Sequence, residues 1–383
     1  MIKIKRSEGG FIGAYITLYV VLFLFFYHYF RFKGIPPLSW NTLFCIWSSG
    51  ALLMMAPIIP PRWRFSSLRY IHTALAWVGT IGLAFGLYFV LASLVIDTTA
   101  YIFSLSWEPP LPRWDLWLAF CTAFFICLYG YKESMAVRVV SIQIPTEKLP
   151  KEFSRFRILQ ISDLHLGILI NKKMLRQIMK QIQEENPDVI VSTGDLLDGE
   201  IEDVETISQM MLHYHPPYGK FAVTGNHEFY AGIEHALYFT GKAGFHVLRG
   251  KIVEAGPIYI VGVDDPGGRF LKGQPEVEED QLLKNISDRR FTLLLKHRPL
   301  PHRGAVGMFD LQLSGHVHRG QLFPFMAFTW LFYRHTKGLL DLGKGSLLYV
   351  SHGTGTWGPP VRVLAYPELT VIDLVSRSSK EGK

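Results

Sequence analysis

The N-terminal third of the chain contains four stretches that are almost free of charged side chains. A membrane-spanning helix needs about 20 mostly apolar residues, with roughly 17 as the lower limit. Three of the stretches reach this length. The fourth, residues 116–131, is shorter but is flanked by Trp114 and Trp117, and such aromatic residues are typical of a membrane interface. We therefore predict a four-helix transmembrane domain over residues 1–131, with spans at about 11–30, 41–59, 70–96 and 114–131.

The pattern changes after residue 131. Residues 132–154 are polar and contain two prolines, which predicts a connector. Over residues 155–383, short apolar runs alternate with segments of helical periodicity, which predicts an α/β domain. The expected strands are 157–162, 188–192, 220–223, 249–254, 258–263, 291–295, 311–313, 347–350 and 368–374. The expected helices are 172–185, 204–214, 233–244 and 277–286.

The distribution of charge supports this division of the chain. Charged residues make up 19% of the sequence, below the roughly 25% of an average soluble protein. Most of the formal net charge of +7 lies in the apolar third, whereas a nucleic-acid binder would spread its Lys and Arg residues over a folded face. We therefore expect no nucleic-acid partner. The cysteines Cys45, Cys121 and Cys127 all lie in the apolar stretches, so the α/β domain has no disulfide framework.

Basic residues near the ends of the expected spans predict an orientation. With four spans, the N-terminus, the second loop and the C-terminal domain share the side that carries most of these Lys and Arg residues. We therefore expect a multi-pass protein of the inner, or cytoplasmic, membrane with its C-terminal domain in the cytoplasm. If residues 116–131 do not span, the domain lies on the opposite side.

Polar residues cluster directly after five of the expected strands, where open α/β sheets place their functional sites. Asp, His and Asn supply the oxygen and nitrogen ligands that suit Mn, Fe, Zn and similar divalent ions. Alternation along an extended chain would put both donors of an Asp-x-His or His-x-His pair on one side. A turn or a cap explains each cluster alone, but not five together. The clusters are Asp163-x-His165, Gly194-Asp195-x-x-Asp198, Gly225-Asn226-His227-Glu228, Lys296-His297-Arg298 and Gly315-His316-x-His318.

In their order, these clusters resemble the signature of the calcineurin-like metallophosphoesterases, over about residues 155–375. The nearest likeness is to membrane-anchored bacterial enzymes of the UDP-2,3-diacylglucosamine pyrophosphatase type. The late Gly-rich segment, Arg and Pro-Glu of those enzymes are matched by residues 353–355, Arg362 and residues 367–368. The resemblance implies a four-layer α/β sandwich of two sheets flanked by helices. It also implies a metal-dependent phosphoric ester hydrolase with two divalent metal ions.

The resemblance further implies roles for individual residues. One metal ion is expected at Asp163, His165, Asp195 and His318, and the other at Asp195, Asn226, His297 and His316, with a metal-bridging hydroxide as nucleophile. Asn226 should also bind a phosphoryl oxygen. His227 should point away from Asn226, because extended neighbours alternate, and is the candidate for protonating the leaving group. Asp198 either orients His227 or caps a loop. Arg362 either binds a substrate phosphate or is a surface residue.

Residues 323–333 directly follow the His-x-His cluster and are rich in aromatic residues. At 11 residues the segment is too short to span a bilayer. Two interpretations stay open. One is a lid or a membrane-facing lip that receives an acyl chain, and the other is a core segment of the domain.

These observations predict a membrane-bound, dimetal-dependent phosphoesterase that hydrolyses a phosphodiester or pyrophosphate bond, with a lipid-linked phosphate ester as a fitting substrate. The alternative is a membrane sensor or scaffold that uses the same fold to bind a ligand without turnover. Every expected metal position carries a competent residue, which favours the enzyme. A transporter is disfavoured because the expected spans contain almost no ionisable residues.

Overall fold

The computed structural model describes residues 69–103, 114–167, 172–199, 203–268 and 279–377, together with five isolated positions before residue 43. The chain divides into two compact units. The first comprises Met1–Glu133 together with Gly358–Val363, and the second comprises Ser134–Trp357 and Leu364–Lys383.

The first unit contains the long helix α3 (Arg69–Phe103) and most of α4 (Trp114–Met135). Within the described part of the chain, Thr73–Phe103 and Trp114–Met135 are long and apolar enough to cross a membrane. They coincide with the third and fourth expected spans, and the short fourth stretch is part of a 22-residue helix. The expected spans 11–30 and 41–59 lie outside the described residues, apart from isolated positions. The four-helix domain therefore stays a prediction.

A short segment from late in the sequence also belongs to the first unit. The backbone N–H of Arg362 donates to the carbonyl of Gly130 in α4 at 2.9 Å. A Cβ atom at Gly130 would lie 3.0 Å from the Val363 side chain and 3.1 Å from the Arg362 carbonyl oxygen. Glycine therefore allows the close approach of this segment to α4.

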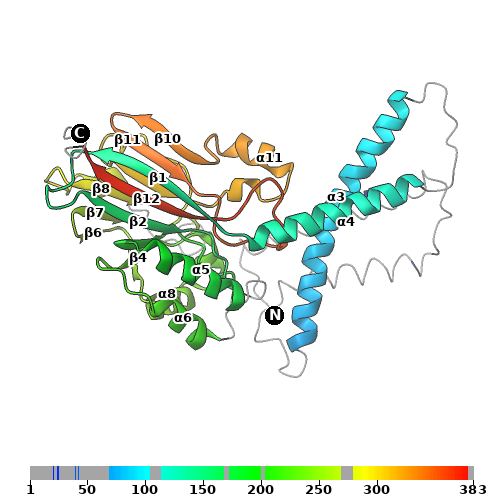
Figure 1. Cartoon of the computed structure of the whole chain (residues 1–383), viewed down its shortest axis with the longest axis horizontal. Coiled ribbons are helices and arrows are strands. Elements are labelled where there is room, and N and C mark those ends of the chain that lie inside the picture. Colours follow the sequence, from blue (N-terminus) through cyan, green and yellow to red (C-terminus); the bar gives the residue numbers. More distant parts are fainter. Residues whose placement is uncertain are drawn as a thin grey trace. The chain divides into compact units, whose positions relative to one another are not determined.

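The second unit is built on two six-stranded mixed sheets (Figure 1). The first sheet has the order β1-β12-β2-β3-β4-β5, and the second has the order β10-β11-β9-β8-β7-β6. The strands of the first are β1 (Arg138–Thr146), β2 (Arg155–Ile161), β3 (Val189–Ser192), β4 (Lys220–Ala222), β5 (His246–Val247) and β12 (Glu368–Ser376). Those of the second are β6 (Lys251–Ala255), β7 (Ile258–Gly262), β8 (Phe291–Leu295), β9 (Leu311–Ser314), β10 (Gly338–Gly343) and β11 (Ser346–Val350).

Side chains that alternate along the strands bury both faces of each sheet. Ile158 of β2 shares one apolar cluster with Leu293 and Leu313 of the second sheet, so the two sheets pack face to face. Leu159 points to the opposite face and packs with the helices that cover it. These helices are α5 (Lys172–Glu185), α6 (Val204–Leu212) and α8 (Ile233–Lys242). α10 (Glu279–Leu283) packs on the outer face of the second sheet. The expected α/β fold with two sheets is confirmed.

The interpretation of residues 132–154 as a connector is wrong in its central part. β1 pairs in parallel with β12 from Arg138 opposite Glu368 to Thr146 opposite Ser376. Its apolar side chains alternate with polar ones, as in a strand with one buried face. The edge strand β10, whose burial also alternates, was not predicted either. The helix expected over 277–286 is the shorter α10 within the described residues.

Candidate metal centre

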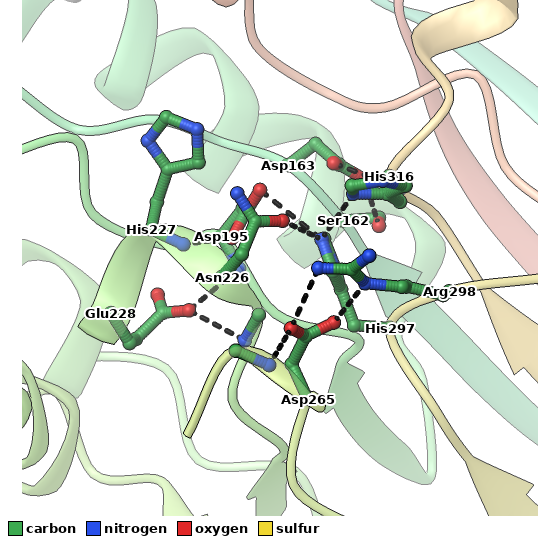
Figure 2. Close-up of polar contacts among 12 residues, drawn as sticks. Ser162, Asp163, Asp195, Asn226, His227, Glu228, Asp265, His297, Arg298 and His316 are labelled. Atoms are coloured by element: carbon green, nitrogen blue, oxygen red, sulfur yellow. Dashed lines mark hydrogen bonds and ion pairs between the residues drawn. The ribbon is translucent and has the colours of Figure 1, made fainter. Parts of the chain in front are cut away.

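The strand ends bring the expected site residues together. β2, β3 and β4 are parallel neighbours in the first sheet, and β8 and β9 are parallel neighbours in the second. The carboxyl ends of parallel strands meet at one edge of a sheet. Figure 2 shows that several side chains that follow these strands converge, and these include Asp163, Asp195, Asn226, His297 and His316.

The first cluster of potential ligands is formed by Asp163, His165 and His318. One ligand atom from each lies within 4.8 Å of the other two, and all three residues are buried. The Nε2 atoms of His165 and His318 are 3.0 Å apart, and His318 Nε2 is 3.4 Å from Asp163 Oδ1. Burial lowers the pKa of His165 to about 4, so this ring is neutral and offers a lone pair. Such a set of facing donors suits a cation.

The second cluster contains Asp195, His297 and His316, with Asn226 beside them. His297 Nε2 lies 3.2 Å from Asp195 Oδ2, 3.2 Å from Asn226 Oδ1 and 3.0 Å from His316 Nδ1 (Figure 2). The other ring nitrogen of His297, Nδ1, is 2.9 Å from the carbonyl oxygen of Thr193. Donation to that carbonyl would leave Nε2 as the free ligand atom.

Asp195 lies between the two clusters. Its carboxylate belongs to the His297–His316 group and also to a group with His165 and His227. Burial alone would raise the pKa of Asp195, but the charges of His297 and His227 hold it well below its usual value. A buried, ionised carboxylate at this point attracts positive charge, which divalent ions would supply. The nitrogen and oxygen donors fit Mn, Fe, Zn or similar ions.

The backbone at these ligands is not extended. Asp163, His165, Asp195, His316 and His318 all have positive φ angles, between 44° and 72°. The expectation that strand-like alternation would align Asp-x-His and His-x-His is therefore wrong. Left-handed conformations at non-glycine residues are sparsely populated and concentrate at functional sites. Turns in this conformation bring the side chains together instead.

His227 also differs from its expected local structure. Asn226 and His227 open the short helix α7 (Asn226–Ala231), so their side chains diverge by helical geometry rather than by strand alternation. Asp198 Oδ1 lies 2.9 Å from His227 Nδ1. The two residues are therefore in contact, as one of the two interpretations of Asp198 expects. Burial opposes a charge on His227, but Asp195 and Asp198 raise its pKa to about 9. Its ring lies edge-on to His165, with centroids 4.7 Å apart.

Glu228 holds the loops that carry the ligands, a function that its place in the sequence cluster did not reveal. Its buried carboxylate accepts four backbone N–H groups. Oε2 accepts from Gly225 at 2.6 Å and from Asp195 at 2.9 Å, and Oε1 accepts from Leu196 at 2.7 Å and from Leu197 at 3.3 Å. One side chain thus joins the loop after β3 to the loop after β4.

Asp163 is fixed in a similar way. The backbone N–H of His316 donates to both carboxylate oxygens at 3.0 Å, and the Ser162 hydroxyl donates to Oδ2. A Cβ atom at Gly315 would collide with Ser162 Oγ and with this carboxylate, and would lie 3.1 Å from Ser162 Cβ. Glycine is therefore needed before His316 because the ligand carboxylate fills the space.

An ion pair between the buried Asp265 and the half-buried Arg298, beside the second cluster, was not predicted. Arg298 Nε donates to Asp265 Oδ2 at 2.7 Å, and its Nη2 donates to Oδ1 at 3.1 Å (Figure 2). Asp265 also accepts the backbone N–H of Gly267 at 2.7 Å, so this segment forms a turn as well. Arg362, the expected phosphate ligand, is fully buried and lies in the segment assigned to the first unit, so a surface position is excluded. Its role in substrate binding stays a prediction.

A family model and two relatives of this chain all point to metallophosphoesterases. Residues 156–320 match the family described as calcineurin-like phosphoesterase. An uncharacterized metallophosphoesterase from Aquifex aeolicus is 38% identical over 260 residues, which cover 67% of this chain and 99% of that protein. A transmembrane protein with metallophosphoesterase domain from Danio rerio is 30% identical over 270 residues, which cover 67% of this chain and 62% of that protein. A solved dimetal phosphatase from Danio rerio overlaps 52% of this chain and 87% of its own, with 15% identity and a TM-score of 0.33.

Proposed function

The chain belongs to the calcineurin-like phosphoesterase family, and on this basis we propose that it hydrolyses a phosphodiester or pyrophosphate bond at the two clusters. Membership confirms the expected metal-dependent phosphoester hydrolase with two divalent ions. The closer likeness to UDP-2,3-diacylglucosamine pyrophosphatases stays a prediction. The observation that carries the proposal is the convergence of Asp and His ligand atoms, within 4.8 Å in each group and all buried except those of the half-buried His316, from strand ends of two sheets.

We assign the metal ions as the family resemblance implies. Asp163, His165 and His318 would hold one ion, and Asn226, His297 and His316 would hold the other, with Asp195 shared between them. A carboxylate has two oxygens and can therefore bind two ions, which suits the position of Asp195 in two of the ligand groups. When bound, the two ions would lower the pKa of a water molecule and stabilise negative charge on the phosphoryl oxygens.

The other side chains act on the substrate. Asn226 turns Oδ1 toward His297, which leaves its amide N–H groups for a phosphoryl oxygen. His227 is held through Nδ1 by Asp198, so its Nε2 is the atom that would give a proton to the departing oxygen. An alkoxide leaving group gains most from such a proton, which makes this arrangement well suited to a phosphodiester.

Two apolar helices and a relative described as a transmembrane protein support membrane association. We propose a multi-pass protein of the inner membrane with the catalytic domain in the cytoplasm. A lipid-linked substrate, such as a phospholipid or a nucleotide-linked acylated sugar, fits an enzyme held at the membrane. A hydrolysis screen on the detergent-solubilised full chain, with these two classes beside soluble diesters, tests this substrate class. Hydrolysis of soluble diesters alone would refute it.

The metal assignment is tested with the same preparation and bis-p-nitrophenyl phosphate in the presence of Mn. Asp195→Asn and His316→Ala should each abolish hydrolysis, because each removes a ligand atom from the second cluster. His302→Ala is the matched control, since this histidine is half exposed and lies outside the clusters. Retained activity in both ligand variants would contradict the two-metal assignment, and loss in all three would show that the assay reports folding alone.

A further inference from the structure

An almost entirely apolar helix follows the histidines of the candidate metal centre without being covered by the rest of the described domain. α11 (Phe325–Phe332) has the sequence FMAFTWLF, and none of its residues is buried. Phe328, Trp330, Leu331 and Phe332 are 55%, 59%, 67% and 79% exposed. Phe328, Leu331 and Phe332 are spaced three and four residues apart and therefore share one face. The interpretation of residues 323–333 as a core segment is wrong for α11.

The helix is firmly attached next to the metal centre. A Cβ atom at Gly320, two residues after His318, would lie 2.5 Å from Met326 Cα, so the backbones of the two segments touch. The backbone N–H of Phe325 donates to Leu322 at 2.7 Å, and the Leu322 side chain is buried. At the other end, the ring of Tyr333 lies edge-on to His316, with centroids 5.3 Å apart. Whatever binds α11 is therefore held close to the ligands.

We propose that α11 is an interfacial helix that inserts its apolar side chains into the surface of an anionic lipid bilayer. The described chain carries two helices long and apolar enough to cross a membrane, and under the proposed membrane association a bilayer is available to the domain. The helix is followed by exposed Arg334 and Lys337, and the sequence has no acidic residue between Asp310 and Asp341. Basic residues beside exposed Trp and Phe are the combination that binds anionic membrane surfaces. This contact would place the metal centre at the membrane surface.

The proposal deepens the proposed function, on which it rests only for the benefit to catalysis. Contact with lipid can be measured without catalysis. The full chain, with Cys45, Cys121 and Cys127 replaced by Ser, carries Phe328→Cys labelled with an NBD fluorophore and is placed in nanodiscs at one chain per disc. Tyr238→Cys, at a residue that is 57% exposed on α8, is the matched control.

Doxyl-labelled phospholipids in phosphatidylcholine–phosphatidylglycerol discs should quench the fluorophore at position 328 and leave that at position 238 unchanged. Quenching at 328 should weaken when phosphatidylglycerol is omitted, because the flanking basic residues lose their partners. Absence of quenching at 328, or equal quenching at both positions, would overturn the proposal. Quenching that requires two chains per disc would assign the face to a second copy and would also overturn it.

Catalysis provides the second measurement. The double variant Phe328→Asp with Phe332→Asp should keep its activity on bis-p-nitrophenyl phosphate, because both side chains are largely exposed and belong to none of the ligand groups. Its KM for a phosphodiester embedded in the bilayer should rise at least about tenfold, since two apolar side chains no longer enter the membrane. An unchanged KM would contradict the catalytic benefit. If no lipid-linked ester is hydrolysed but position 328 is quenched, the substrate proposal fails and the membrane contact stands.

Discussion

Glu228 offers the sharpest test of how the metal centre is built, because one side chain serves both ligand-bearing loops. Each carboxylate oxygen accepts two backbone N–H groups, from Gly225 and Asp195 on Oε2 and from Leu196 and Leu197 on Oε1. In Glu228→Gln, one of these oxygens becomes an NH₂ group, which donates and cannot accept. Whichever way the amide is turned, two buried N–H groups then face a donor.

The size of the effect follows from these contacts. Each buried N–H donor that loses its acceptor lowers the free energy of unfolding by about 1–3 kcal/mol, so two such donors lower it by about 2–6 kcal/mol. In a domain of this size each kcal/mol lowers the thermal midpoint by roughly 2–4 °C. We therefore expect the midpoint of Glu228→Gln to fall by roughly 4–24 °C. Asp195 should shift with its backbone, and misplacement of about 1 Å costs on the order of 100-fold in rate.

The experiment compares full-chain variants in detergent, with the same Mn concentration throughout, by thermal unfolding and by hydrolysis of bis-p-nitrophenyl phosphate. Glu205→Gln is the control, because this glutamate lies in the same unit and its side chain is 64% exposed. Exposed substitutions change stability by about 0.5 kcal/mol or less. A midpoint of Glu228→Gln equal to that of Glu205→Gln, with full activity, would refute the idea that Glu228 organises the two loops.

Three further predictions use the same preparation. Gly315→Ala should remove most of the activity and metal binding, because the added Cβ displaces the carboxylate of Asp163. Gly241→Ala is the control and should leave both intact, since a Cβ atom there has no heavy atom within 4 Å. Equal activity in the two variants would refute the steric argument. His227→Ala should slow the hydrolysis of an alkyl phosphodiester about 10²–10⁴-fold and that of bis-p-nitrophenyl phosphate much less, because the poorer alkoxide leaving group needs the proton more. The metal content should be unchanged. Loss of metal would instead make His227 a ligand. A reporter fused to the C-terminus should be accessible only from the cytoplasm, and external accessibility would contradict the proposed orientation.

The position of the site could be predicted because the signal for each ligand lies in a short stretch of sequence. Each ligand follows an apolar run directly, and parallel strands bring such positions to one edge, so Asp163 and Asp195 could be expected side by side. The sequence could not show that His297 and His316 come from a second sheet, because strand order depends on long-range pairing. β1 could have been found, since its polar and apolar residues alternate, but prolines at 145 and 150 favoured a connector. The structure has Pro145 inside β1, on an edge strand, where proline is tolerated.

The local geometry of the ligands was harder to predict for a physical reason. Regular alternation holds only while φ stays negative, and five of the seven proposed metal ligands adopt positive φ. Such conformations cost of order 1–3 kcal/mol each and persist only where surrounding contacts enforce them. In this site the enforcing contacts are long-range, such as the N–H groups of His316 on Asp163 and of Asp195 on Glu228. The two residues of each such contact are far apart in the sequence, so no short stretch of sequence contains both.

The aromatic helix shows a different limit of sequence reasoning. A helix that is apolar on nearly all sides is normally buried, so composition left a core position for residues 323–333 open beside a contact with lipid. The expectation that an apolar helix is buried assumes that only water surrounds the protein. The proposed membrane association gives the domain a second environment, the lipid bilayer, in which exposed Phe, Trp and Leu side chains are stable. Within the described domain α11 contributes no buried residue, so the same composition that predicts a core predicts, at this position, a contact with lipid.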